Sequence, residues 1–242
     1  MKWLFPLAVT LLLVGCNNTD EPEATEEENI GATETTNEEV GLQISTMKDW
    51  ASYSSHFKFT HKATNETSEE IIKEMTYDMD KKQLYIITTR TAETPVVSEQ
   101  YADENGTYSR TQPNEWLQSD KDLLSTSPAT KRADLIQYLI DTSVGTGYSK
   151  TDNGTEVATL TFKATDIPAI YDKITTSILP IMDVAFTSAD VNVLLVTLQI
   201  NDDTLTRYEI IATTSDGQSQ SFTESFAHIN ELPKIDVPEG IE

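Results

Sequence analysis

Hydrophobic and polar side chains alternate along much of the chain after residue 50. The alternation is clearest in five short runs, at residues 55–61, 74–80, 83–89, 96–102 and 106–110. A period of two is typical of β-strands that bury one face. Turn sequences such as Glu104-Asn105-Gly106 and Asp216-Gly217 separate strand-like runs at the spacing of an antiparallel meander. The pattern predicts hairpin-connected strands rather than parallel βαβ units.

The strongest strand signal covers residues 190–201. One face of this segment carries four large aliphatic side chains, Leu194, Val196, Leu198 and Ile200. A face of this kind must be buried. The other face begins with Val193 and Leu195 but then becomes polar, so we expect it to be covered only in part. Residues 204–213 should return as the hairpin partner of this strand.

Two segments change to helical spacing. Ser127 followed by Pro128 is typical of a helix start, and Leu135, Ile136, Leu139 and Ile140 follow at helical steps. A second stripe opens after Thr165-Asp166 and consists of Ile167, Ile170, Ile174, Ile178 and Ile181. Pro180 should end or kink this helix near Leu179. The predicted fold class is α+β and mostly antiparallel β, a large curved sheet with a few helices packed on one face.

The first sixteen residues have the pattern of an export signal. The uncharged run Leu4–Val14 follows Lys2, has the length of a signal-peptide core, and is too short to span a bilayer as a helix. It leads into Leu13-Val14-Gly15-Cys16, which holds the chain's single cysteine. A buried thiol or an intermolecular disulfide are the other interpretations of a lone cysteine. The stretch resembles the bacterial lipobox, which implies that residues 1–15 are removed and that Cys16 carries a diacylglyceryl anchor.

Residues 16–43 are predicted to form an acidic, disordered tether. The stretch 17–40 contains nine carboxylates and no Lys or Arg, and it has too few apolar side chains to offset the entropy of ordering. Residues 44–242 then make up one β-rich domain. The chain has 40 acidic and 17 basic residues, a net charge of -23. Nucleic acid is therefore excluded as an expected partner, and the surface should not adhere to an anionic membrane.

No segment has the pattern of a catalytic or metal site. The sequence contains no nucleophile elbow, no paired-histidine zinc motif and no phosphate-binding loop. His56 and His61 have opposite strand parity and should point to opposite faces. We therefore expect no enzyme activity, no cofactor and no metal.

Apolar and aromatic positions remain as candidates for a ligand site. They are either ordinary core or the lining of a cavity that a curved sheet leaves under its helices. The candidate cavity residues are Phe57, Phe59, Met75, Tyr77, Tyr85, Ile170, Ile174, Ile178, Met182, Leu194 and Val196. On this hypothesis the stripe of the second helix lines a cavity rather than filling a tight core.

The order of these parts resembles Gram-positive lipoproteins of the LolA/LppX-like superfamily. The resemblance rests on the lipobox, the acidic tether, the segment ENGTYSRTQPNEWLQ with Trp116, the long hairpin at 191–212 and the C-terminal segment. The C-terminal motif consists of Phe226, Ile229, Asn230, Ile235, Val237 and Pro238. The family implies a half-barrel of antiparallel strands whose concave side is plugged by helices, a shape associated with carrying acyl chains or lipoproteins. Asn114-Glu115 departs from the family's usual turn before the tryptophan.

These observations lead to one functional hypothesis and one alternative. The hypothesis is a lipoprotein anchored through Cys16 on the extracytoplasmic face of the cell membrane, which binds a hydrophobic or amphipathic ligand such as a lipid or a lipidated partner. The alternative is an envelope interaction or sensor protein whose core is filled by its own side chains.

Overall fold

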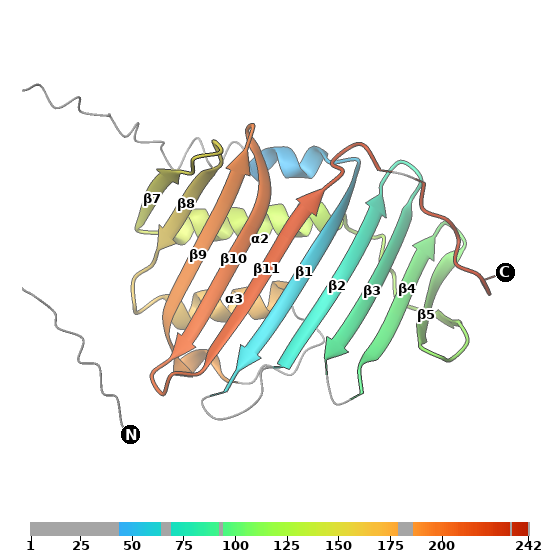
Figure 1. Cartoon of the computed structure of the whole chain (residues 1–242), viewed down its shortest axis with the longest axis horizontal. Helices are drawn as coiled ribbons and strands as arrows, with labels where there is room; N and C mark the ends of the chain where they lie inside the picture. The colour runs from blue at the N-terminus through green and yellow to red at the C-terminus, as the bar shows by residue number, and fades with distance from the viewer. Residues whose placement is uncertain (1–43, 64–68, 92–93, 179–185, 233, 242) are drawn as a thin grey trace, which may run out of the picture. The chain divides into compact units, whose positions relative to one another are not determined.

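A computed structural model describes residues 44–63, 69–91, 94–178, 186–232 and 234–241 (Figure 1). The predicted leader, the lipobox with Cys16, the acidic tether, Pro180 and Met182 lie outside the described residues.

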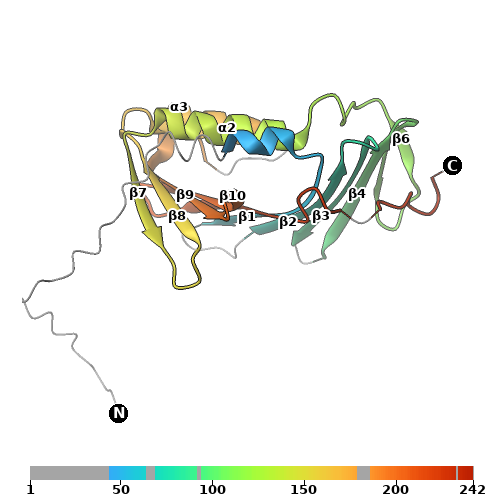
Figure 2. The same ribbon diagram turned by 90° about the horizontal axis from the view of Figure 1, so that it is seen from above.

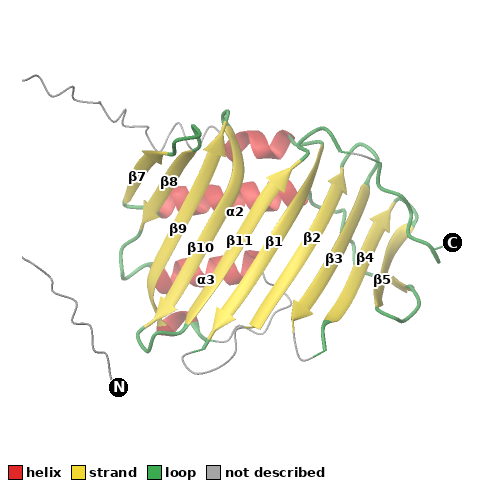
Figure 3. Cartoon of the chain, viewed as in Figure 1, coloured by secondary structure: helices red, strands yellow, loops and turns green. Residues whose placement is uncertain are grey.

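The described residues form one open antiparallel sheet of eleven strands (Figure 3). The strands are β1 (Ser52–Lys62), β2 (Glu69–Asp78), β3 (Gln83–Thr91), β4 (Val96–Asp103), β5 (Gly106–Thr111), β6 (Leu117–Ser119), β7 (Gly145–Lys150), β8 (Glu156–Thr161), β9 (Val191–Asn201), β10 (Thr204–Thr214) and β11 (Ser219–Ala227). Their order in the sheet is β6-β5-β4-β3-β2-β1-β11-β10-β9-β8-β7. Two meanders therefore lie side by side, joined where β1 pairs with β11.

The helices lie on one face of this sheet. They are η1 (Thr46–Asp49), α2 (Pro128–Thr142), α3 (Ile167–Ile178) and η2 (Ser188–Asp190). Figure 2 shows α2 and α3 above β7–β11 and β1, while β2–β6 bend up beside them. We call this helix-bearing side the concave face and the other side the outer face. The predicted fold class, a curved antiparallel sheet with helices on its concave face, is confirmed.

The core fills the space between the helices and the central and β9 side of the sheet. On β9 the residues Leu194, Val196, Leu198 and Ile200 are all buried, while Val193 and Leu195 on the outer face are 53% and 40% exposed. Both predictions for this strand are confirmed. Ile174 of α3 is completely buried in the same core cluster, as are the apolar residues of α2. The apolar sides of both helices pack in this cluster with the sheet, which removes them from water.

Candidate functional site

The register of β1–β6 determines which side chains face the helices. Phe59 pairs with Ile71, Ile71 pairs with Arg90, and Arg90 pairs with Val96, so these four lie in one row across the concave face. The next row on the same face consists of Phe57, Lys73, Thr88, Ser98 and Thr111. A third row consists of Ser55, Met75, Ile86, Gln100, Ser109 and Leu117. Alternation within each strand sends the residues between them to the outer face.

The concave face of β2–β6 bears a pocket of about 540 Å³. This volume lies within the range of ~300 to 1,000 Å³ that is usual for small-molecule sites. Its apolar lining consists of Phe59, Ile71, Ile86, Val96 and Leu117. Hydroxyl and amide groups of Thr88, Ser98, Gln100, Ser109 and Thr111 lie between them. A mixed lining of this kind suits an amphipathic molecule better than a purely apolar one.

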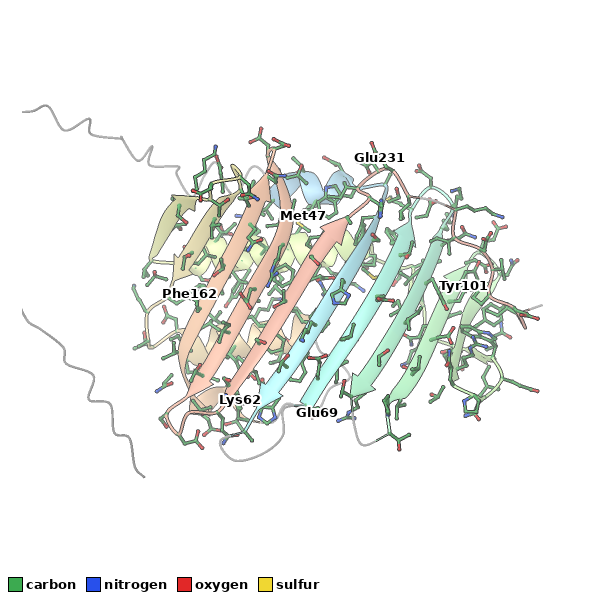
Figure 4. The ribbon with its side chains drawn as sticks, viewed as in Figure 1. Met47, Lys62, Glu69, Tyr101, Phe162 and Glu231 are labelled. Atoms are coloured by element: carbon green, nitrogen blue, oxygen red, sulfur yellow. The ribbon has the colours of Figure 1, made fainter. Side chains whose placement is uncertain are left out.

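Two arginines near the pocket are each paired with a carboxylate. Glu69 lies at the start of β2 (Figure 4), and its Oε1 accepts a hydrogen bond of 2.6 Å from Arg90 Nε. Arg110 donates from Nε and from a terminal nitrogen to the two oxygens of Glu99, each at 3.0 Å. These carboxylates partly neutralise their guanidinium groups.

Lys73 is in a different position. It lies between Phe57 and Thr88 in the second row, half-buried, with Nζ 5.9 Å from the centre of the Phe57 ring. Within the described ranges no carboxylate forms an ion pair with it. Burial lowers the pKa of Lys73, and the nearby Arg132 guanidinium lowers this pKa further, although the Glu224 carboxylate opposes both effects.

A buried polar cluster joins α2 to the sheet beside this pocket. Glu224 of β11 is only 1% exposed. Its Oε2 accepts hydrogen bonds of 2.6 Å from Arg132 Nε and from Tyr208 Oη, and its Oε1 accepts one of 2.9 Å from Ser55 Oγ. Burial raises the pKa of Tyr208, as does the Glu224 charge. Both carboxylate oxygens of Glu224 have hydrogen-bond donors within this cluster, so the cluster holds α2 on the sheet.

Tyr85 lies on the outer face, because it pairs with Thr76 and Tyr101 rather than with concave residues. Its hydroxyl donates a hydrogen bond of 2.6 Å to Glu99 Oε2, and Gln112 also donates to this carboxylate. Burial and then the hydrogen bond to Glu99 raise the pKa of Tyr85 to about 12. The Arg110 guanidinium lies 4.6 Å from the centre of the Trp116 ring. These contacts of Glu99 and Arg110 connect β3, β4 and β5 on the outer face.

A second hollow of about 360 Å³ lies mainly over outer-face residues of β1, β2, β3 and β11. Its lining includes His56, Glu74, Thr76, Tyr85 and Ile87. The lining is largely polar, so this hollow is the weaker candidate for an apolar ligand.

The predicted cavity residues are distributed among three environments. Phe59 lines the larger pocket, Tyr85 lines the outer hollow, and Met75 borders that hollow but points to the concave face, where it packs against the core. The other described candidates, Phe57, Tyr77, Ile170, Ile174, Ile178, Leu194 and Val196, belong to the core cluster. The α3 stripe thus packs in the core and is not part of the pocket lining, because it lies against the equally apolar face of β9. Whether any of these residues contacts a ligand stays a prediction.

The pocket residues that the sequence analysis missed share one signal. Ile71 and Lys73 have the same strand parity as Met75 and Tyr77, and Ile86 has the parity of Leu84. Aligning β1, β2 and β3 as successive hairpins would have placed them on the face of Phe59. Lys73 itself gives no further signal in the sequence, because lysine is usually exposed.

Within the described part of the chain, no group of three or more His, Cys, Asp or Glu side chains could hold a metal ion. The helices of that part are too short or too polar to cross a membrane.

Comparisons with known proteins give similarities of fold only. The sequence matches no family model. It matches no curated protein either. The structure is similar to a LolA superfamily protein from Nitrosomonas europaea, with 9% identity, a TM-score of 0.30, and coverage of 82% of this chain and 96% of that chain. A putative outer membrane lipoprotein-sorting protein domain from Vibrio parahaemolyticus is also similar, with 7% identity, a TM-score of 0.25, and coverage of 79% and 93%. At these values no ligand or activity is transferred from them.

Proposed function

We propose that this chain is a lipid-anchored binding protein, of the kind found in Gram-positive bacteria, that holds an amphipathic ligand on the concave face of β2–β6. The observation that carries the proposal is the pocket of about 540 Å³ on the part of the sheet that lies beside the helices rather than beneath them. Five apolar side chains in this pocket could take an acyl chain, and the hydroxyl and amide groups could take a polar head. The proposed role is binding rather than catalysis.

The proposed location is the extracytoplasmic face of the cell membrane. It is supported by the sequence Leu13-Val14-Gly15-Cys16 after an apolar leader. A diacylglyceryl group on Cys16 would supply two acyl chains, which is what stable anchoring requires. Replacing Cys16 with alanine should abolish metabolic labelling with a fatty acid and shift the protein out of the detergent phase. Labelling that persists in this variant would contradict the anchor.

The pocket can be tested with a matched pair of substitutions on one strand. The chain from Asn17 to Glu242 keeps every described residue and lacks the proposed acylation site. Ile86 lies on the concave face and lines the pocket, whereas its neighbour Ile87 lies on the outer face. Ile86→Trp should fill the pocket and reduce the affinity for a fluorescent fatty acid roughly tenfold or more, the size of effect expected when a well-fitted apolar group is excluded.

Ile87→Trp is the control and should bind the probe like the unchanged chain. Thermal unfolding of both variants shows whether either has lost its fold. A probe that does not bind the unchanged chain contradicts the binding proposal. Binding that is lost in Ile87→Trp but kept in Ile86→Trp would place the site in the outer hollow instead.

A second candidate function is an envelope interaction protein with a self-filled core. The observation that favours it is the tight packing of α3 against β9, where Ile174 and Val196 are completely buried. On this candidate the pocket over β2–β6 contacts a protein segment rather than a lipid, and the fatty-acid probe does not bind.

A further inference from the structure

The charge of the pocket is opposite to that of the chain. The whole chain has a net charge of -23. Apart from Arg110 and Glu99, which point to the outer face, the lining of the larger pocket nevertheless contains three cationic side chains, Lys73, Arg90 and Lys121, against two carboxylates, Glu69 and Glu115. An acidic protein would repel an anionic ligand at most points of its surface, so a locally cationic lining distinguishes this site from the rest.

The three cations of the pocket differ in their surroundings. Arg90 is paired with Glu69, and Lys121 is exposed to water. Lys73 is the half-buried cation for which the described residues supply no ion pair. Burying a charge without a partner is costly, so a ligand that supplies the missing negative charge gains more at Lys73 than at Arg90 or Lys121.

Apolar side chains surround Lys73 on the concave face. Ile71 and Met75 are its neighbours on the same face of β2, and Ile86 lies diagonally across on β3. Leu117 of β6 lies further along the third row, separated from Ile86 by the polar Gln100 and Ser109. A chain of methylene groups could lie against Ile71 and Ile86 while its head contacts the ammonium group of Lys73.

We infer that the pocket selects an amphiphile with a single apolar chain and an anionic head, and that Lys73 is the residue that recognises the head. This inference rests on the proposed function, since it names the ligand class and the specificity-determining residue of the same pocket. The Phe57 ring turns its negative face to the ammonium group, with Nζ 5.9 Å from the ring centre, and Thr88 lies opposite Lys73 on β3. Burial lowers the pKa of Lys73, as expected for an ammonium group that has no ion pair among the described residues.

Three probes with the same tail test the inference. Dodecanoate, dodecanol and dodecyltrimethylammonium differ in the charge of the head, and each is titrated below its micelle concentration into the Asn17–Glu242 chain by competition with a fluorescent fatty acid. We expect dodecanoate to bind roughly tenfold or more tightly than dodecanol, because a charge-assisted contact to a half-buried group contributes more than a neutral one. The cationic probe should bind most weakly.

Lys73→Met should remove the preference for dodecanoate while keeping the affinity for dodecanol, and Lys73→Arg should restore much of the preference. Lys58→Met is the matched control, because Lys58 lies on the outer face of the neighbouring strand and its loss changes the net charge equally. Lys121→Met tests the other pocket cation that has no ion pair in the described ranges. Thermal unfolding of each variant separates lost recognition from lost folding.

The outcomes separate this inference from the proposed function. Binding of none of the three probes to the unchanged chain contradicts the proposed function itself. Equal binding of dodecanoate and dodecanol by the unchanged chain leaves the binding function standing and overturns the role of Lys73. A preference that survives Lys73→Met but disappears in Lys121→Met assigns the head to the exposed lysine and also overturns it.

Discussion

Substitution of Ile174 measures how tightly the core between α3 and the sheet is packed. From the sequence, this residue was expected to line a cavity, and its truncation would then cost little. In the structure it is completely buried in the core. We now expect Ile174→Ala to lower the free energy of unfolding by ~2 to 5 kcal/mol, because the lost transfer energy and the new cavity add.

Leu195→Ala is the control for Ile174→Ala, since Leu195 is 40% exposed on the outer face of β9. It should cost less than about 1 kcal/mol. Denaturant midpoints of the two variants measure the difference. Similar small losses in both would mean that α3 is loosely packed.

Glu99 makes the free energy of unfolding depend on pH in the acidic range. Burial alone would raise the pKa of this carboxyl, but hydrogen bonds from Arg110, Tyr85 and Gln112 outweigh burial and lower it. A carboxyl with a lowered pKa in the folded state stabilises the fold above its unfolded pKa of about 4.5, and this stabilisation is lost as the pH falls through the folded pKa. Below pH 4.5 the unchanged chain should therefore lose stability more steeply than Glu99→Gln.

The measurement is the thermal midpoint between pH 6 and pH 3. Glu104→Gln, in the exposed turn between β4 and β5, is the control and should follow the unchanged chain. If Glu99→Gln has the same slope as the unchanged chain, the outer-face cluster does not contribute to acid stability.

At the scale of elements, α2 is attached to the sheet by a charge as well as by apolar contacts. Replacing Glu224 with glutamine keeps one acceptor oxygen, for either Tyr208 or Ser55, and leaves the Arg132 guanidinium without its counter-charge. Losing one partner of a buried ion pair typically costs ~3 to 5 kcal/mol. We expect Glu224→Gln to be destabilised by an amount of this order in urea unfolding.

The double variant Glu224→Gln with Arg132→Met should recover part of this loss, because it no longer buries an unpaired charge. A double variant that is less stable than the single one would show that Arg132 stabilises α2 through contacts other than Glu224.

The elements could be predicted from the sequence to the extent that their side chains alternate. Strands β1–β5 and β9–β10 and the start of α2 at Pro128 were predicted, because each combines a clear period with a turn or cap signal. The strand ranges of β6, β7 and β8 were missed. β6 has three residues, and β7 contains Gly145 and Gly147 and few apolar side chains. Such edge strands are defined by hydrogen bonds to a neighbour rather than by their own pattern.

The pocket was less predictable than the fold, because it depends on strand register and on where the helices end. Period alone showed that Phe57 and Phe59 share a face. It could not show that Phe57 belongs to the core cluster while Phe59 also lines the pocket. Tyr85 was assigned to the cavity without its register, and pairing with Thr76 places it on the outer face.

At the scale of the whole molecule, the acidic segment before the domain should not contribute to its stability. Residues 20–40 offer almost no apolar surface to bury. Deleting them should leave the thermal midpoint of the Asn17–Glu242 chain unchanged within about one degree, since surface changes of this kind are usually within ~0.5 kcal/mol. Differential scanning calorimetry measures this, and a loss of several degrees would show that the segment packs on the domain.

The pairing of β1 with β11 affects how the chain folds during synthesis. Ser54 of β1 lies beside Ala227 of β11, 173 residues later in the sequence. The centre of the sheet is therefore completed only after β11 has been synthesised, and β1 exposes an unpaired edge until then. Contacts of such sequence separation form slowly, and open edges pair readily with other chains. Newly made molecules at high concentration should therefore be most prone to aggregation before β11 closes the sheet.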